Sequence, residues 1–185
     1  MAVKLKGSGG YIAKLALILL AITVVVALLL GLVNYITADR IAEINEQKTK
    51  DAMGEVLPAD SYEPLDTGGF AGVAAAYRAV ADGETMGYVI ETLPSGFGGS
   101  IDMVVGVGTD GTVTGVSIIS MSETAGLGAN AAKEQFRSQY VGGSGIFAVD
   151  KDGGDIDSLT GATITSRAVT NGVNTALSFF SSIQG

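Results

Sequence analysis

The stretch DSLTGATITS, residues 157–166, joins an acidic loop to the last amphipathic segment of the chain. Its small residues let a backbone come close to a ligand, and four hydroxyl groups stand between Thr160 and Ser166. A helix that starts near Thr163 would point its first N–H groups, which have no helical acceptor, at an anion such as a phosphate. The residues alone leave two interpretations open: a phosphate site, or a Ser/Thr cluster in which Thr160 or Thr163 caps the helix.

The segment that follows has the spacing of a helix with one apolar face. That face consists of residues at positions i, i+4, i+7, i+8 and i+11, namely Val169, Val173, Ala176, Leu177 and Phe180. A surface helix of this kind must bury its apolar face, so we expect it to pack against a sheet.

Four β-prone runs lie upstream, at residues 74–80, 86–92, 101–107 and 112–120. The turn sequences between them predict an antiparallel meander of about four strands. One turn, GVGTDG at residues 106–111, has the G-x-G-x-x-G spacing, but a strand follows it, so it predicts a hairpin and not a dinucleotide site. A short helix at residues 129–140 and a short strand at 146–149 complete an α+β domain.

An uncharged stretch, LALILLAITVVVALLLGLV at residues 15–33, is long enough to cross a membrane as a helix. It lacks a small-x-small cleavage site at its end, so it is expected to be a retained anchor and not a signal peptide. Lys4, Lys6 and Lys14 precede it, which places the N-terminus in the cytoplasm by the positive-inside rule. A loose helical pattern follows, and Pro58 and Pro64 are expected to end it.

The expected division of the chain has four parts. They are a cytoplasmic N-terminus (residues 1–14), a transmembrane helix (15–36), a stalk or juxtamembrane helix with a linker (37–66) and an extracytoplasmic domain (67–185).

The composition excludes several kinds of chemistry. The chain has no Cys and no His, which removes thiolate nucleophiles, Ser-His-Asp triads, c-type haem attachment and nearly all zinc sites, so redox chemistry requires an organic cofactor. After Lys14 there are eight basic and nineteen acidic residues, and this net charge of −11 argues against nucleic-acid binding.

The acidic loop carries four aspartates, Asp150, Asp152, Asp155 and Asp157. An EF-hand starting at Asp150 would need Gly at position six and Glu at position twelve, where Asp155 and Gly161 stand. We therefore expect a solvated loop, with an irregular cation site as the lesser alternative, and assign no metal ligand.

The opening stretch resembles the flavinylation motif D-x-x-[ST]-G-A-T-x-T of the FMN-binding domain family. The whole chain, with its anchor, is similar to the G subunits of Rnf ion-translocating electron-transport complexes. The resemblance implies one FMN per chain, covalently bound through its phosphate to the hydroxyl of Thr165. The other matching positions of the motif are Asp157, Thr160, Gly161, Ala162 and Thr163.

A second segment, SETAGLG at residues 122–128, resembles the E-T-P-G-L-G loop of the same family, with Ala125 in place of proline. The resemblance implies that Leu127 borders the flavin ring together with Gly126 and Gly128. It also implies that Glu123 and Thr124 lie near the polar edge of the ring or near its phosphate.

The implied function is that of an electron-carrier subunit in a membrane-bound ferredoxin:NAD⁺ oxidoreductase complex that couples electron transfer to Na⁺ or H⁺ translocation. The chain would be a redox subunit and not a complete enzyme, so no catalytic residue is assigned. Its implied partners are the other Rnf subunits, the cell membrane and a flavin transferase that uses FAD and Mg²⁺.

Three alternatives remain open at this point. One is the C subunit of the Na⁺-translocating NADH:quinone oxidoreductase, which is similar in anchor, domain and motif. Another is a stand-alone membrane-tethered flavoprotein that carries electrons to an extracytoplasmic reductase. The third is a membrane-tethered binding domain without a cofactor, in which the Ser/Thr cluster only caps a helix.

Overall fold

A computed structural model describes residues 8–184 of the chain. Its first element is a long helix, α1 (Ser8–Val56), whose stretch Gly10–Ala38 is long and apolar enough to cross a membrane and has no buried residue. The chain divides into two compact units, the first ending at Asn45 and the second starting at Glu46. Helix α1 ends two residues before Pro58, as the sequence predicts. Lys4 and Lys6 lie outside the described residues.

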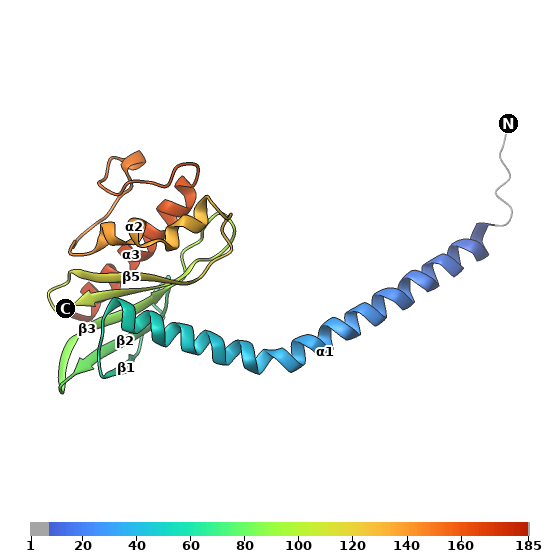
Figure 1. Cartoon of the computed structure of the whole chain (residues 1–185), viewed down its shortest axis with the longest axis horizontal. Helices are drawn as coiled ribbons and strands as arrows, with labels where there is room; N and C mark the ends of the chain where they lie inside the picture. Colours follow the sequence, from blue (N-terminus) through green and yellow to red (C-terminus); the bar gives the residue numbers. More distant parts are fainter. Residues whose placement is uncertain (1–7, 185) are drawn as a thin grey trace. The chain divides into compact units, whose positions relative to one another are not determined.

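The second unit is built on one antiparallel sheet with the strand order β1-β2-β3-β4-β5 (Figure 1). The strands are β1 (Ser61–Leu65), β2 (Val73–Ala81), β3 (Glu84–Thr92), β4 (Asp102–Gly108) and β5 (Val113–Ser120). The four strands β2 to β5 confirm the predicted meander. The hairpin at residues 106–111 is also confirmed, because the Gly108 N–H donates to the Thr112 carbonyl at 2.8 Å.

Strand β1 was not predicted, since residues 37–66 were assigned to a stalk helix and a linker. It lies at the edge of the sheet, where Pro64 is opposite Tyr77 of β2. A proline is tolerated in an edge strand because such a strand pairs with a neighbour on one side only, so a missing N–H need not remove a hydrogen bond of the sheet.

Helix α3 (Thr163–Gln184) covers one face of the sheet. Every second residue of the central strands points to it, including Ile90 on β3 and Met103 and Val105 on β4. The predicted apolar face of α3 is confirmed, since all five of its residues are buried in this core: Val169, Val173, Ala176, Leu177 and Phe180.

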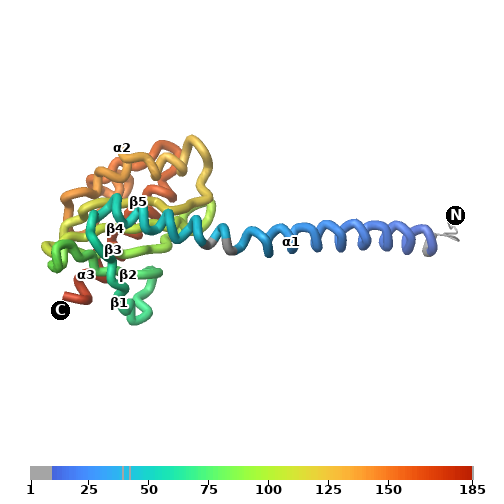
Figure 2. The backbone as a smooth tube through the Cα atoms, turned by 60° about the horizontal axis from the view of Figure 1, so that its bottom comes forward, coloured from blue at the N-terminus to red at the C-terminus, as the bar shows by residue number. Residues whose placement is uncertain are grey.

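The opposite face of the sheet is covered by the last turns of α1 (Figure 2). There Met53 and Val56 pack with Val89 of β3 and Val104 of β4, and all four side chains are buried. The sheet is therefore apolar on both faces, which explains why β4 is an almost continuous run of buried residues.

The helix predicted at residues 129–140 is wrong as a single element. The structure has three short ones instead: η1 (Gly128–Ala132), α2 (Glu134–Arg137) and η2 (Ser138–Tyr140). Lys133 interrupts the helix because its backbone is extended, with φ −73° and ψ 142°. The Arg137 side chain donates a hydrogen bond of 2.9 Å to the Ala132 carbonyl. Phe136 and Tyr140 still enter the core, with ring centroids 5.9 Å apart.

The strand predicted at residues 146–149 is also wrong. Asn174 of α3 pairs with the backbone of Phe147 in both directions, accepting its N–H at 2.9 Å and donating to its carbonyl at 2.8 Å. A side chain thus replaces the strand partner, and only Val149 forms an isolated bridge, with Ile156.

The acidic loop is held by its own aspartates. Asp150, in the short helix η3 (Asp150–Asp152), accepts the Ser158 N–H at 3.0 Å, and hydrogen bonds from Ser158 lower the pKa of Asp150 to about 2. Asp152 accepts two hydrogen bonds from Arg167 of α3, at 2.6 and 2.8 Å. These carboxylates therefore fasten the loop to the helix that follows it.

Candidate functional site

Thr165 lies in the first turn of α3, with only 1% of its surface exposed. Its hydroxyl donates a hydrogen bond of 2.6 Å to Oε2 of Glu123, which lies in the loop after β5. The two residues that the sequence assigned to separate motifs are therefore in direct contact. The hydroxyl of Thr165 is held in one orientation, toward a carboxylate.

Glycines on three sides make room for the Glu123 carboxylate. Its Oε1 accepts the Gly98 N–H at 2.9 Å. A Cβ atom at Gly128 would lie 2.5 Å from Oε2 of Glu123 and 2.6 Å from Oγ1 of Thr165, and one at Gly96 would lie 2.3 Å from Oε1. A side chain at either position would therefore displace the Glu123 carboxylate, and one at 128 would also displace the Thr165 hydroxyl, from this arrangement.

The side chain of Ser166 links the start of α3 to the loop before it. Its Oγ accepts the Leu159 N–H at 2.9 Å and donates to the Ala162 carbonyl at 3.1 Å. Thr163 is the first residue of the helix and Ala162 precedes it, so the predicted cap by Thr163 is wrong. The first-turn N–H groups, from Thr163 to Thr165, have no acceptor within the helix and form the positive end of its dipole.

A pocket of about 450 Å³ opens at this helix start. Its walls carry three large apolar side chains that are well exposed: Phe97 (70%), Leu127 (44%) and Ile164 (52%). Such a surface beside a hydroxyl and a helix N-terminus suits a ligand with a flat apolar part and an anionic group. Eight of the residues predicted from the sequence line the pocket: Glu123, Thr124, Leu127, Gly128, Gly161, Ala162, Thr163 and Thr165.

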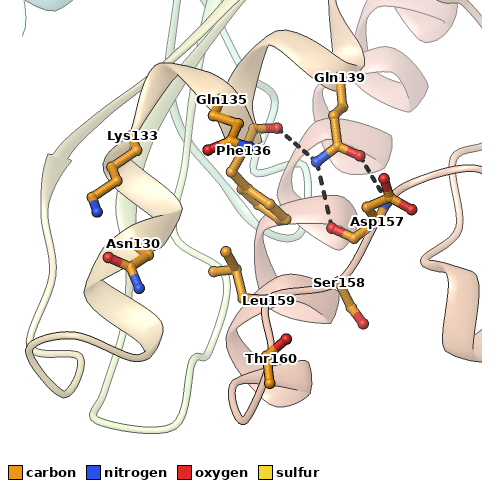
Figure 3. Close-up of a pocket in the computed structure, with 9 residues that line it drawn as sticks. All are labelled: Asn130, Lys133, Gln135, Phe136, Gln139, Asp157, Ser158, Leu159 and Thr160. Carbon is orange, nitrogen blue, oxygen red and sulfur yellow. Dashed lines mark hydrogen bonds between the residues drawn. The ribbon is translucent and has the colours of Figure 1, made fainter.

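Two other motif residues, Asp157 and Thr160, line a neighbouring pocket of about 390 Å³ (Figure 3). There Gln139 holds the backbone of Asp157, accepting its N–H at 2.7 Å and donating to its carbonyl at 3.4 Å. Asp157 and Thr160 thus line the pocket that Asn130 and Lys133 also border, and neither of them lines the pocket beside Thr165.

Gly126 lines neither of these two pockets. It has a positive φ of 79° in the loop that carries Leu127, and its carbonyl accepts a hydrogen bond of 2.9 Å from Asn130. Gly126 therefore contributes to the conformation of the loop and does not line the pocket itself.

Comparisons with known proteins match both parts of the chain. Residues 96–178 match the FMN-binding domain family, and residues 10–56 match the N-terminal region of RnfG. A G subunit of the Na⁺-translocating ferredoxin:NAD⁺ oxidoreductase complex from Acetobacterium woodii is 36% identical over 191 residues, covering 92% of each chain. The chain belongs to the family of Rnf G subunits.

Other relatives among the G subunits have similar identity. The protein from Methanosarcina acetivorans, of an ion-translocating oxidoreductase complex, is 33% identical over 94% of this chain and 97% of its own. That of Clostridium ljungdahlii, from a complex named proton-translocating, is 37% identical over 81% of each chain. Relatives from Na⁺-translocating and H⁺-translocating complexes thus share the sequence of this Rnf family.

The fold of this Rnf family member also occurs in a crystal structure. The C subunit of the Na⁺-translocating NADH-quinone reductase from Parabacteroides distasonis superposes with a TM-score of 0.55 and 21% identity, covering 78% of this chain and 96% of that one. This likeness concerns the fold. The N-terminal match and the relatives among the Rnf G subunits decide between the two complexes that the sequence left open.

Sequence reasoning missed two residues of the pocket beside Thr165, Phe97 and Ile164. Phe97 stands between glycines in the segment GFGG, residues 96–99, and Ile164 occupies the variable position of the motif. Neither the residue types nor their spacing indicates a ligand, so the sequence carried no signal that could have found them.

The residues of this pocket fit an FMN, the ligand of the matching domain family. A Cβ atom at position 128 would fill the space next to the Thr165 hydroxyl, and glycine leaves this space open for a phosphate. The N-terminus of α3 supplies a positive potential for that phosphate. Phe97, Leu127 and Ile164 offer apolar contacts for the ring. The N–H groups at the helix start thus match the phosphate of FMN, and the apolar walls match its ring.

Proposed function

We propose that this chain carries electrons as the G subunit of a membrane-bound ferredoxin:NAD⁺ oxidoreductase complex that translocates Na⁺ or H⁺. It does so through one FMN, linked by a phosphoester bond to Thr165. The other subunits of that complex are its partners, and a flavin transferase attaches the cofactor. FMN, when bound, supplies reversible transfer of one or two electrons.

The observation that carries this proposal is the position of the Thr165 hydroxyl. It lies at the N-terminus of α3 and lines a pocket with exposed apolar walls, inside the region that matches the FMN-binding domain family. A Ser/Thr cluster that served only as a helix cap would not need such a pocket. The capping interpretation named Thr160 or Thr163, whereas among the residues that the structure describes it is Ser166 whose side chain bonds the backbone at the helix start.

Each part of the site has a task in this function. The first-turn N–H groups of α3 and the glycines would hold the phosphate, and Phe97, Leu127 and Ile164 would offer apolar contacts to the ring and keep water from it. A phosphoester through Thr165 keeps the carrier from diffusing away. Asp157 and Thr160 shape the turn before α3 from its other side.

The proposed layout places residues 1–14 in the cytoplasm and residues 15–36 in the membrane. Residues 37–66 then lead to an FMN-binding domain of residues 67–185 outside the cell or in the periplasm. The lysines before the apolar stretch support this orientation.

The absence of cysteine makes the orientation straightforward to test. With Ile146→Cys, at a side chain that is 95% exposed, a membrane-impermeant maleimide should label intact cells or spheroplasts. With Ala2→Cys, labelling should require lysis. The opposite pattern would place the domain in the cytoplasm.

The covalent bond is tested by mass. The full chain is co-expressed with a flavin transferase, denatured, and compared with Thr165→Val and with Thr175→Val, a matched change further along α3 and outside the pocket. We expect the wild type and Thr175→Val to be heavier by one FMN less one water, and Thr165→Val to be unmodified. An unmodified wild type, or FMN on Thr165→Val, would contradict the proposal.

A further inference from the structure

We infer that Glu123 is the general base that takes the proton from Thr165 when the flavin phosphate is transferred to this hydroxyl. The inference rests on the proposed function, because it concerns how the chain is prepared to receive its cofactor. It assigns a chemical role to a residue that the family resemblance only placed near the flavin.

The geometry meets the first requirement for a base. Oε2 of Glu123 lies 2.6 Å from Oγ1 of Thr165, within the range for direct proton transfer, and the hydroxyl already donates to it. The Gly98 N–H fixes the other carboxylate oxygen, and the glycines at 96 and 128 leave the space that the carboxylate occupies in this position. The acceptor of the proton is therefore in position before the reaction starts.

The chemistry of the nucleophile requires such a group. A threonine hydroxyl is a weak nucleophile unless an adjacent base takes its proton. The chain has no histidine and no cysteine, and among the ten residues that line the pocket Glu123 is the only one with an ionisable side chain. The acceptor protein thus supplies a base at the reacting atom itself.

The step balances with FAD as the flavin donor. Thr165 Oγ1 attacks the phosphorus atom of the FMN half of FAD, and an Oγ–P bond forms. The bond between that phosphorus and the bridging pyrophosphate oxygen breaks, AMP leaves, and the hydroxyl proton moves to Oε2 of Glu123. Protonation of Glu123 also removes the repulsion that a carboxylate and a phosphodiester would have at this short distance.

The test compares two variants that separate a base from a structural contact. Glu123→Gln keeps the size of the side chain and one acceptor oxygen in place of two, but it cannot accept the proton. Glu123→Asp keeps the carboxylate but shortens the side chain. A base predicts that the aspartate variant reacts faster than the glutamine variant, whereas a purely structural role predicts the reverse order.

The measurement uses the purified full chain in detergent, with flavin transferase, FAD and Mg²⁺, and follows the mass increase over time. We expect Glu123→Gln to slow the initial rate by about 10²- to 10⁴-fold relative to wild type, the usual range for removal of general-base catalysis. Glu123→Asp should fall between the two. Glu134→Gln, an exposed carboxylate on α2, is the matched control and should react like the wild type.

Thermal unfolding of each variant, measured before the reaction, restricts the comparison to folded protein. If Glu123→Gln reacts at the wild-type rate, or faster than Glu123→Asp, the inference is overturned while the bond to Thr165 stands. If the wild type stays unmodified, or Thr165→Val is modified, the proposed function itself fails.

Discussion

Glu91 and Asp102 place two carboxyl groups close together on neighbouring strands, β3 and β4. They lie on the same sheet face as the buried Val89 and Val104, the face that the end of α1 covers. Burial raises the pKa of both groups, and the charge of Asp102 raises the pKa of Glu91 further. Tyr77 on β2 has a raised pKa as well, first from burial and then from the Glu91 charge. The pair therefore favours a bound proton.

This pair predicts a pH dependence with a definite sign. A carboxyl group whose pKa is raised by folding stabilises the fold below its ordinary pKa, 4.5 for Glu91 and 3.8 for Asp102, and this stabilisation is lost as the pH rises through the raised values. Glu91→Gln should therefore increase the free energy of unfolding at pH 7.5, by less than about 1 kcal/mol because both groups are partly exposed and screened. The gain should shrink as the pH is lowered.

Urea unfolding of the full chain at several pH values checks this expectation. Glu84→Gln, an exposed carboxylate on the same strand, serves as the control and should not change the pH profile. A Glu91→Gln variant that is less stable than the wild type at pH 7.5 would show that the ionised pair is accommodated without cost.

At the scale of elements, two glycines set how closely α1 approaches the sheet. Gly106 of β4 and Gly115 of β5 are paired in register, and Val56 lies against both. The Thr114 hydroxyl donates to the Val56 carbonyl at 2.7 Å, which satisfies a backbone acceptor at the helix end. The G-x-G spacing at residues 106–108 thus serves helix packing and a hairpin.

Two glycine substitutions should have opposite effects on stability. A Cβ at Gly115 would lie 2.8 Å from the Val56 Cα, so Gly115→Ala should destabilise the second unit by about 1–3 kcal/mol. Nothing lies within 4 Å of a Cβ at Gly54, on α1, so Gly54→Ala should stabilise it by about 0.5–1 kcal/mol. The urea midpoints of the two variants should move in opposite directions, and a shift of both in one direction would contradict the packing argument.

The elements also show what the sequence could and could not predict. The strands β2 to β5 and helix α3 follow from local periodicity, and the structure confirms them. The prediction of a strand at residues 146–149 was wrong because the side chain of Asn174, 27 residues from Phe147, forms hydrogen bonds with the backbone groups that a strand partner would use. The helix at 129–140 failed because Lys133 is extended, which helix propensity does not reveal.

The candidate site divides in the same way. The resemblance in two short motifs named Thr165 and Glu123, but their hydrogen bond depends on how the loop after β5 meets the start of α3. Phe97 and Ile164 joined the pocket only in three dimensions, because neither has a residue type or spacing that predicts a ligand.

For the whole molecule, the compact unit starts at Glu46 and includes the end of α1 and strand β1. A chain that starts at residue 46 should therefore fold and stay soluble. One that starts at residue 67 would expose Ala79, Val89 and Val104, which Met53 and Val56 cover in the full chain. We expect the shorter chain to aggregate or to lose cooperative unfolding, which gel filtration and circular dichroism would detect. Cooperative folding from residue 67 would mean that the α1 end is dispensable.

Both edges of the sheet are partly protected against pairing with additional strands. On one side β1 has only five residues and contains Pro64, which has no N–H. On the other side, Val113 of β5 exchanges backbone hydrogen bonds with Gly142 and Gly143, and Arg137 donates to the Val116 carbonyl at 2.6 Å. Edge-to-edge pairing of neighbouring copies is therefore disfavoured, even at the high local concentration that a membrane surface imposes. We expect redox partners to meet this domain through its loops and helices.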